Sequence, residues 1–288
     1  MDLSIIIISY NTKELLQTCL TSLSGSLSKA TFSYEVLVID NNSADGTREL
    51  VTKQFPWVNL VANRENTGFG KANNQGIGMA KGEYILLLNS DTQVKNDAVG
   101  KLFAFSRQNP RSFIGAKLFN TDGTPQTSCG PFLTLPVAFA ALFAKGDKLG
   151  LTRWSPQSIR TVDWVSGACI MAPKKAFADG LLFDEGIFMY MEEIDLLYRA
   201  KMKGYTTLFY PEAHIMHVGS GSSKEKRKGP VLNIYRGIIY FYKKHRTPLE
   251  LRIVRLLLQW KALISLTIGK LTNNTYLTST YEEAIKLV

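Results

Sequence analysis

Cysteine is scarce in this chain, whose 288 residues include only Cys19, Cys129 and Cys169. These residues lie too far apart for a disulfide framework, and their spacing does not match that of a zinc site. Cys19 and Cys169 stand among apolar residues, where a reduced thiol packs like a small hydrophobic side chain. The cysteine content therefore favours a reducing, cytoplasmic compartment.

Long hydrophobic runs are missing where a membrane anchor would need them. No basic segment precedes the apolar residues 3–8 and no small-residue cleavage site follows them, so we expect a first strand there rather than a signal peptide. Near the carboxyl end, Arg255 and Lys261 interrupt the most apolar helix, which falls short of the ~20 apolar residues of a membrane span.

Acidic residues are outnumbered, 24 to 34, by lysine and arginine, which gives a net charge of +10. This excess favours an anionic partner: nucleic acid, a phosphate-bearing substrate or acidic lipid. Nucleic acid is the least favoured, because the sequence shows no recognition motif and its basic residues alternate with apolar runs. The basic residues of the carboxyl-terminal region are Lys224, Lys226, Arg227, Lys228, Arg236, Lys243, Lys244, Arg246, Arg252, Arg255, Lys261 and Lys270.

Predicted strands alternate with predicted helices in the first third of the chain. Strands are expected at residues 3–9, 35–40, 58–62 and 84–88, and helices at 15–23, 47–55 and 70–80. Apolar residues form 45% of the chain, enough for one large core. The alternation with short connections predicts an α/β fold with a doubly wound, mostly parallel sheet.

The rest of the chain is less regular. We expect a hairpin turn at residues 120–123, strands at 162–172 and 206–210, and a helix at 192–203 ended by Gly204. A loop at 219–230 precedes helices at 231–245 and 249–268, which Pro248 separates. The second of these helices is apolar around most of its circumference and carries a narrow stripe of Arg252, Arg255 and Gln259. Such a helix either lies in a membrane surface or packs against the rest of the chain or a second subunit.

One predicted strand ends abruptly in three polar residues. The apolar residues 85–88 are followed by Asn89, Ser90 and Asp91. Buried parallel strands deliver their last residues to the edge of the sheet where α/β proteins bind ligands. A carboxylate there can hold a divalent cation against a diphosphate, but a plain turn after a strand explains the same residues.

Seven polar motifs follow one another in a fixed order. They occupy residues 8–11, 39–47, 66–76, 89–91, 163–168, 188–196 and 214–221. The ordered set resembles the inverting glycosyltransferase family 2, with its GT-A fold, and within it the bacterial rhamnosyltransferases of cell-surface polysaccharide synthesis. The resemblance covers about residues 3–222.

The resemblance places a nucleotide over the first motifs. Asp40, at a strand end, is expected to accept the ring N–H of uracil or thymine, and Tyr10 to stack on that base. The rival reading of residues 68–73 as a dinucleotide-binding loop fails, because the third glycine is missing and the segment follows the third strand rather than the first. The expected nucleotide-binding residues are Ser9, Tyr10, Asn11, Asp40, Asn42, Asn66, Gly68, Lys71, Asn89 and Ser90.

The family's metal motif, Asp-any-Asp, aligns with residues 89–91, where Asn89 replaces the first acid. By resemblance, Asp91 binds Mn²⁺ or Mg²⁺ that bridges the diphosphate, and His217 is a second ligand. An imidazole beside a carboxylate suits Mn²⁺ somewhat better than Mg²⁺. A histidine hydrogen-bonded within a loop is the alternative explanation of His217.

Three carboxylates within four residues begin the helix predicted at 192–203. Acidic residues are favoured at any helix amino terminus, but three exceed that need. By resemblance, Glu193 is the general base, although the family has an aspartate there, and Glu192 and Asp195 support it. Asp195 is also spaced to pair with Arg199. The expected acceptor- and sugar-binding residues are Trp164, Ser166, Gly167 and Tyr190, and Phe188 either joins them or packs in the core.

The resemblance implies a metal-dependent inverting transferase that moves L-rhamnose from dTDP-rhamnose to a lipid-linked or polysaccharide glycan. A UDP-hexose donor, or a non-catalytic nucleotide-sugar-binding protein, are the alternatives. Residues 1–222 would form the GT-A catalytic domain, with a nucleotide-binding half (1–95) and an acceptor-binding half (96–222). Residues 223–288 would form basic amphipathic helices that place the protein peripherally on the cytoplasmic face of the membrane, or that join a homodimer.

Overall fold

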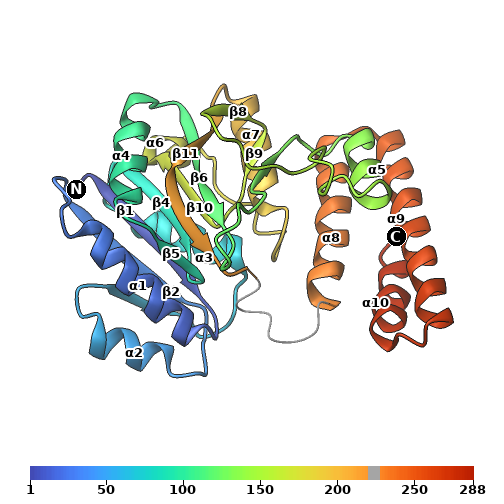
Figure 1. Cartoon of the computed structure of the whole chain (residues 1–288), viewed down its shortest axis with the longest axis horizontal. Helices are drawn as coiled ribbons and strands as arrows, with labels where there is room; N and C mark the ends of the chain where they lie inside the picture. Colours follow the sequence, from blue (N-terminus) through green and yellow to red (C-terminus); the bar gives the residue numbers. More distant parts are fainter. Residues whose placement is uncertain (220–227) are drawn as a thin grey trace.

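The computed structural model describes residues 1–219 and 228–288 (Figure 1). Gly221, Lys224, Lys226 and Arg227, together with the expected domain boundary at residues 222 and 223, lie outside the described residues. The first half of the chain has the predicted alternation of strands and helices. The strands are β1 (Leu3–Ser9), β2 (Tyr34–Asp40), β3 (Asn59–Ala62) and β4 (Tyr84–Asn89). The helices between them are α1 (Lys13–Leu27), α2 (Thr47–Gln54) and α3 (Phe69–Met79).

These four strands are parallel and lie in the order β3-β2-β1-β4. The sheet continues through β10 (Cys169–Pro173), β6 (Ser112–Phe119), β11 (Thr206–His217) and β5 (Thr92–Val94), and β8 (Arg160–Val162) pairs with β11. Among the described strands of this sheet, β5, β8 and β10 run against the others. The α/β fold with a mostly parallel sheet is therefore confirmed.

The strand predicted at 162–172 is wrong, because the chain leaves the sheet in its middle. β8 ends at Val162, β9 (Trp164–Val165) pairs with β7 (Cys129–Gly130) in a separate two-stranded sheet, and β10 begins at Cys169. Between them, the Ser166 hydroxyl accepts the Ala168 N–H at 3.3 Å and closes a turn. β11 is longer than predicted, because its pairing with β6 resumes after a bulge between Tyr210 and His214.

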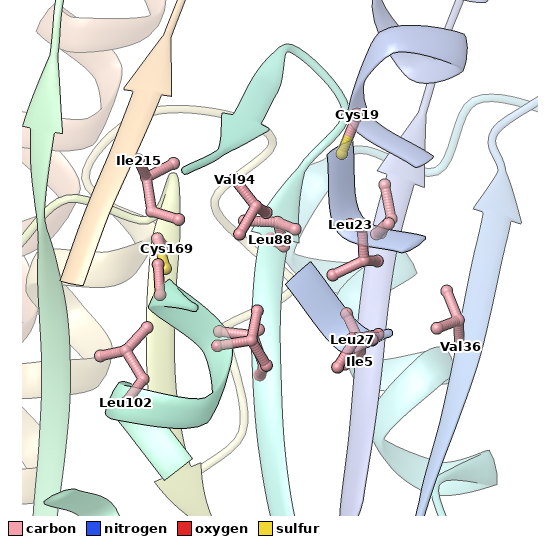
Figure 2. Packing of buried hydrophobic residues seen from close by; sticks show 14 of the residues in the cluster. Ile5, Cys19, Leu23, Leu27, Val36, Leu88, Val94, Leu102, Cys169 and Ile215 are labelled. Atoms are coloured by element: carbon pink, nitrogen blue, oxygen red, sulfur yellow. The ribbon is translucent and has the colours of Figure 1, made fainter. Parts of the chain in front are cut away.

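The apolar alternation within each strand builds a core on both faces of the sheet. In β1, Ile5 and Ile7 face the core under α1 and α4 (Ala98–Gln108), while Ile6 and Ile8 face the opposite core. Figure 2 shows the first of these cores, with Ile5, Leu88 and Cys169 from three neighbouring strands. Cys19 and Cys169 are buried there as predicted, and burial raises the pKa of each thiol to about 12.

The carboxyl-terminal helices form a third core with a helix from the middle of the chain. They are α8 (Lys228–His245), α9 (Pro248–Leu271) and α10 (Thr275–Ile285), and α5 (Leu135–Phe143) joins them. Figure 1 shows this group beside the sheet, on the side away from α1 and α2. α9 begins at a capping box in which Thr247 and Glu250 satisfy each other's backbone N–H groups. The predicted helices are present, and α10 is an addition that the apolar pattern did not predict.

Within the described ranges, none of these helices is long and apolar enough to cross a membrane.

Candidate active site

The carboxyl ends of β1 and β4 open into a cavity of about 430 Å³. The start of α7 (Glu192–Met202) and the end of β11 close its other side. Its lining includes the predicted site residues Tyr10, Asn66, Asn89, Ser90, Asp91, Ser166, Gly167, Tyr190, Glu192, Glu193 and His217. Residues 10 and 217 are thus brought to one place. A second, smaller cavity of about 260 Å³ is lined by Asp163 and Lys201, which form an ion pair.

Asp40 lies at the end of β2 with its side chain fully buried. One carboxylate oxygen accepts the Arg48 guanidinium at 2.6 Å and the Ser43 N–H at 3.2 Å. The other oxygen is buried and has no hydrogen-bond partner among the described residues. A buried acceptor of this kind needs a donor, and the ring N–H of a pyrimidine base is one.

Asn41, the next residue, was not predicted as a site residue, yet it lines the cavity and holds the loop after β3. Its side-chain amide donates to Asn66 Oδ1 at 3.0 Å and to the Gly68 carbonyl at 3.2 Å. Its oxygen accepts Asn63 Nδ2 at 3.0 Å. Gly68 adopts a φ of +87°, a conformation that residues with a side chain rarely adopt. Asn41 therefore places Asn66 at the cavity wall.

Six predicted nucleotide-binding residues lie outside the cavity lining: Asp40 and Gly68, described above, and Ser9, Asn11, Asn42 and Lys71. Ser9 is fully buried and joins Thr12 and Ser90 in a chain of hydroxyl contacts at 3.0 Å each. Asn11 accepts the Ala44 N–H at 2.8 Å, and Asn42 is an exposed turn residue that faces Arg48 at 3.4 Å. Lys71 is exposed on α3.

Asn74, on the same helix as Lys71, holds a neighbouring loop. Its side chain exchanges two hydrogen bonds of 2.9 Å with the backbone of Phe183. The Asp45 carboxylate accepts the N–H groups of Thr47 and Lys13, which closes the turn before α2. Ser9, Asn11 and Asn42 thus shape the loops behind the cavity wall rather than the wall itself.

Asp91 and His217, expected as metal ligands, lie side by side. His217 Nε2 is 3.3 Å from Asp91 Oδ1. The other ring nitrogen, Nδ1, is 2.8 Å from Gln126 Oε1, an arrangement that fixes the ring's orientation. The strand pairing keeps the two residues together, since Thr92 of β5 pairs with His217 of β11. A carboxylate and an imidazole with a supporting amide fit a divalent cation.

This pair alone would leave coordination positions for substrate. In residues 1–219 and 228–288, no group of three or more His, Cys, Asp or Glu side chains could hold a metal ion. A cation held by Asp91 and His217 would therefore take its remaining ligands from water and from phosphate oxygens, as Mg²⁺ and Mn²⁺ do in nucleotide-binding sites.

Glu192 and Glu193 enter the cavity from the first turn of α7. Each has one carboxylate oxygen, Oε2, that is buried without a hydrogen-bond partner in the described structure. Burial raises the pKa of both carboxyl groups, and the charge of Glu193 adds to the rise at Glu192. The positive charge of Arg153 and the Gly167 N–H oppose the rise at Glu193. Glu193 is therefore the member of the pair that ionises more readily.

Asp195 does not reach the cavity. Its side chain is fully buried and contacts three nitrogen atoms: Arg199 Nε at 2.7 Å, Lys244 Nζ at 2.9 Å and His245 Nε2 at 2.7 Å. Despite burial, these hydrogen bonds and charges lower its pKa to about 2. The predicted Asp195–Arg199 pair is confirmed. The geometry gives Asp195 a contact with α8 instead of a contact with substrate.

The expected acceptor-binding residues divide into two groups. Ser166, Gly167 and Tyr190 line the cavity. Trp164 is 4% exposed, belongs to the second core, and donates its ring N–H to the Pro131 carbonyl at 2.9 Å. It therefore packs in the core, because β9 turns it away from the turn that Ser166 begins. Phe188 is half exposed, and its carbonyl accepts the Phe69 N–H at 3.1 Å.

Residues 4–128 match the family model described as glycosyl transferase family 2. The match covers less than half of the chain, and over that part the chain is similar to this family. Over 235 residues it is 28% identical to an N-acetylglucosaminyl-diphospho-decaprenol L-rhamnosyltransferase of Mycobacterium tuberculosis, with 75% of each chain covered. It is 24% identical over 222 residues to the rhamnosyltransferase WbbL of Escherichia coli, covering 74% of this chain and 82% of that protein.

Solved structures show the same fold. The chain superposes on residues 1–349 of S. aureus TarS with a TM-score of 0.54 and 16% identity, over 99% of this chain and 90% of that one. It also superposes on GalNAc-T7 bound to UDP, GalNAc and Mn²⁺, with a TM-score of 0.58 and 18% identity, over 84% of this chain and 50% of that one. The predicted GT-A fold is thereby confirmed.

Several cavity residues were not predicted from the sequence. Arg153, Gln126, Thr127 and Met189 line the cavity, and Arg153 also lies over the Trp164 ring at 5.1 Å. Arg153 and Gln126 come from irregular segments without a recurring pattern, so nothing in their spacing pointed to them. Asn41 did carry a signal, because it stands directly after Asp40 at the end of a predicted strand.

The variant Glu192→Gln is expected to stabilise the fold at neutral pH. Because the folded state raises the pKa of Glu192, the wild-type carboxyl group costs no stability below its unfolded pKa and progressively more as pH rises through the folded pKa. The amide removes that cost, so the Tm should rise by a few degrees at pH 7.5 and stay unchanged at pH 4. Thermal unfolding at both pH values measures this, and an equal shift at both would contradict it.

Proposed function

We propose that this glycosyltransferase is a metal-dependent, inverting enzyme that moves L-rhamnose from dTDP-rhamnose to a lipid-linked glycan. The observation that supports this most is the joint position of Asp91, His217 and Glu193 on one cavity of about 430 Å³. Such a cavity accommodates a sugar with its diphosphate. The donor-side residues come from β1, β2 and β4, and the base comes from α7.

The chemistry follows from these positions. Glu193 takes the proton of an acceptor hydroxyl, and that oxygen attacks the anomeric carbon from the face opposite the diphosphate. The bond from the anomeric carbon to the phosphate oxygen breaks, and its electron pair leaves with the diphosphate. When bound at Asp91 and His217, Mn²⁺ or Mg²⁺ would stabilise the charge on that leaving group. One displacement inverts the anomeric centre.

The nature of the donor is argued from the base-binding end and from the relatives. The unpartnered oxygen of Asp40 suits the ring N–H of thymine or uracil alike. Two relatives that share about three quarters of this chain are named rhamnosyltransferases, and one of these names includes a diphospho-decaprenol acceptor. We therefore favour dTDP-rhamnose over a UDP-hexose, and an acceptor of the diphospho-polyprenol type.

The test is a panel of donors with Mn²⁺ or Mg²⁺. The purified protein is mixed with dTDP-rhamnose, UDP-glucose or UDP-N-acetylglucosamine and with an N-acetylglucosaminyl-diphospho-polyprenol, and the product anomer is read by NMR. Transfer from dTDP-rhamnose with inversion supports the proposal. Preferred transfer from a UDP-sugar would replace the donor, and binding of nucleotide-sugars without transfer would favour a non-catalytic binding protein.

We further propose that α9 docks on the cytoplasmic face of an anionic membrane, which would make the protein peripheral there. A narrow stripe of α9 that includes Val254, Leu258 and Ala262 is buried against the neighbouring helices. The remaining surface exposes Leu249, Leu256, Trp260, Leu263, Ile264, Ile268 and Leu271 together with Arg252, Arg255 and Lys270. Exposed apolar side chains beside basic ones match an anionic lipid surface, where each basic residue adds about 1 kcal/mol.

The double variant Leu256→Ser, Trp260→Ser is expected to weaken binding to phosphatidylglycerol vesicles by at least about tenfold, because each lost side chain would otherwise be worth about 1.5–3 kcal/mol on burial. Trp57→Ser, at an exposed tryptophan outside α9, is the matched control. Vesicle co-sedimentation measures the effect. Unchanged sedimentation would reject the membrane, and loss of a dimer in analytical ultracentrifugation would assign this face to a second subunit.

A further inference from the structure

The turn that precedes the two cavity glutamates has an unfavourable backbone. Tyr190 and Met191 adopt φ values of +68° and +76°, one directly after the other, and neither is glycine. Such values are sterically disfavoured for residues with a side chain and persist only where the surroundings hold them. Because α7 begins at the next residue, this turn sets the direction from which Glu192 and Glu193 enter the cavity.

α8 packs directly against this turn through a glycine. A Cβ at Gly237 would lie 2.8 Å from Met191 Cγ, 2.9 Å from Met191 Cβ and 2.9 Å from the Tyr190 carbonyl oxygen. Met191 is buried in the third core beside Tyr235, Ile238 and other residues of the carboxyl-terminal helices. Only a glycine lets α8 approach the strained turn this closely.

A second contact joins the two helices two turns further along α8. Lys244 and His245 reach the fully buried carboxylate of Asp195, which lies two residues after Glu193. Lys244 also bridges to Asp184, whose carboxylate accepts the Tyr240 hydroxyl at 3.0 Å. Residues 237, 244 and 245 lie seven and eight positions apart, and so on one face of α8. That face therefore holds the first turn of α7 at both of its ends.

We propose that α8 is a positioning element for catalysis: Gly237, with Lys244 and His245, fixes the Tyr190–Met191 turn and thereby the place of the Glu193 carboxylate. This inference rests on the proposed role of Glu193 as the base. It gives the carboxyl-terminal helices a part in the transfer reaction in addition to any contact with a membrane.

The variant Gly237→Ala tests the proposal, because its added methyl group must displace the turn. We expect kcat to fall by about 10–100-fold, since a misplacement of about 1 Å has that effect. The Kd of dTDP-rhamnose with Mn²⁺ should stay within about twofold, because the donor side is built from other strands. Gly25→Ala in α1, where a Cβ meets no atom of the described chain within 4 Å, should match the wild type.

The ion-pair contact is tested with His245→Ala and His245→Gln. Alanine removes the contact with Asp195 and should lower kcat, whereas glutamine keeps an N–H donor and should restore most of it. A kcat for Gly237→Ala within twofold of Gly25→Ala would overturn the proposal. So would a parallel loss of kcat and donor binding, which would mean general damage to the fold.

The variant Glu193→Gln separates a failure of the proposed base from a failure of the proposed positioning role of α8. If Glu193→Gln still transfers sugar, Glu193 is not the base, whatever Gly237→Ala does. If Glu193→Gln is inactive and Gly237→Ala keeps its full kcat, only the positioning role of α8 is rejected.

Discussion

Glu193→Gln is expected to lower kcat by about 10²–10⁴-fold, the range that general-base catalysis contributes. Glutamine has the same shape and keeps the packing of α7, but its amide cannot take the proton of the acceptor hydroxyl. The donor Kd should stay near the wild-type value, because Asp40, Asn41 and Asp91 are untouched. Single-turnover transfer and calorimetric titration of the donor measure the two quantities separately.

Glu192→Gln is the matched control for this prediction. The two glutamates are neighbours and both line the cavity, but Arg153 and the Gly167 N–H favour the charged form of Glu193 alone. Glu192→Gln should therefore keep more activity than Glu193→Gln. The reverse order would make Glu192 the base.

The pH dependence of the transfer rate is an independent test of Glu193 as the base. Because burial raises the pKa of Glu193, the base is protonated at a higher pH than an ordinary glutamate. On acidification, the wild-type rate should therefore decline already above the ordinary glutamate pKa of 4.5. A profile that stays flat to that value would contradict Glu193 as the base.

Asp91→Asn is expected to abolish metal-stimulated transfer, with a loss of at least about 100-fold, because the stabilisation of a leaving diphosphate by a cation is worth several kcal/mol. The amide is a weaker ligand than a carboxylate for a hard cation. Treatment of the wild type with EDTA should reproduce the loss, and Mn²⁺ should restore the wild type but not the variant. Donor-dependent thermal shifts with and without Mn²⁺ provide a second readout.

Asp122→Asn, in the exposed hairpin turn, is the control for a general charge effect. His217→Ala should weaken Mn²⁺ binding less than Asp91→Asn does, since it removes a neutral ligand. If the Asp91→Asn protein still responds to Mn²⁺, Asp91 is not a metal ligand, and the cation binds to other residues.

The sequence predicted best those elements that are determined by the pattern of neighbouring residues. The alternation of Ile5 to Ile8 marks a strand with both faces buried, and the short connections that follow imply parallel neighbours. The antiparallel place of β10 between β4 and β6 depends on pairing between segments more than 50 residues apart, which no local pattern records. α10, which is rich in Thr and Ser, is stabilised by its packing against α9.

The site residues also divide into those that a local pattern indicates and those placed only by the folded arrangement. Asp91 and Glu193 could be found because each stands at the end of a regular element, where side chains of that type are exposed to ligands. Trp164 was misplaced, because an aromatic beside Ser166 and Gly167 does not tell which side of the chain it faces. Arg153 and Gln126 reach the cavity through loops, and their positions follow only from the folded arrangement.

The position of β10 has a consequence for synthesis of the protein on the ribosome. β4 is an apolar strand, and in the described sheet its edge away from β1 pairs with β10. About 80 residues must therefore emerge after β4 before that edge is paired. During this interval the growing chain presents an open apolar edge to other nascent chains, so we expect early folding intermediates to depend on a chaperone until Pro173 has been added.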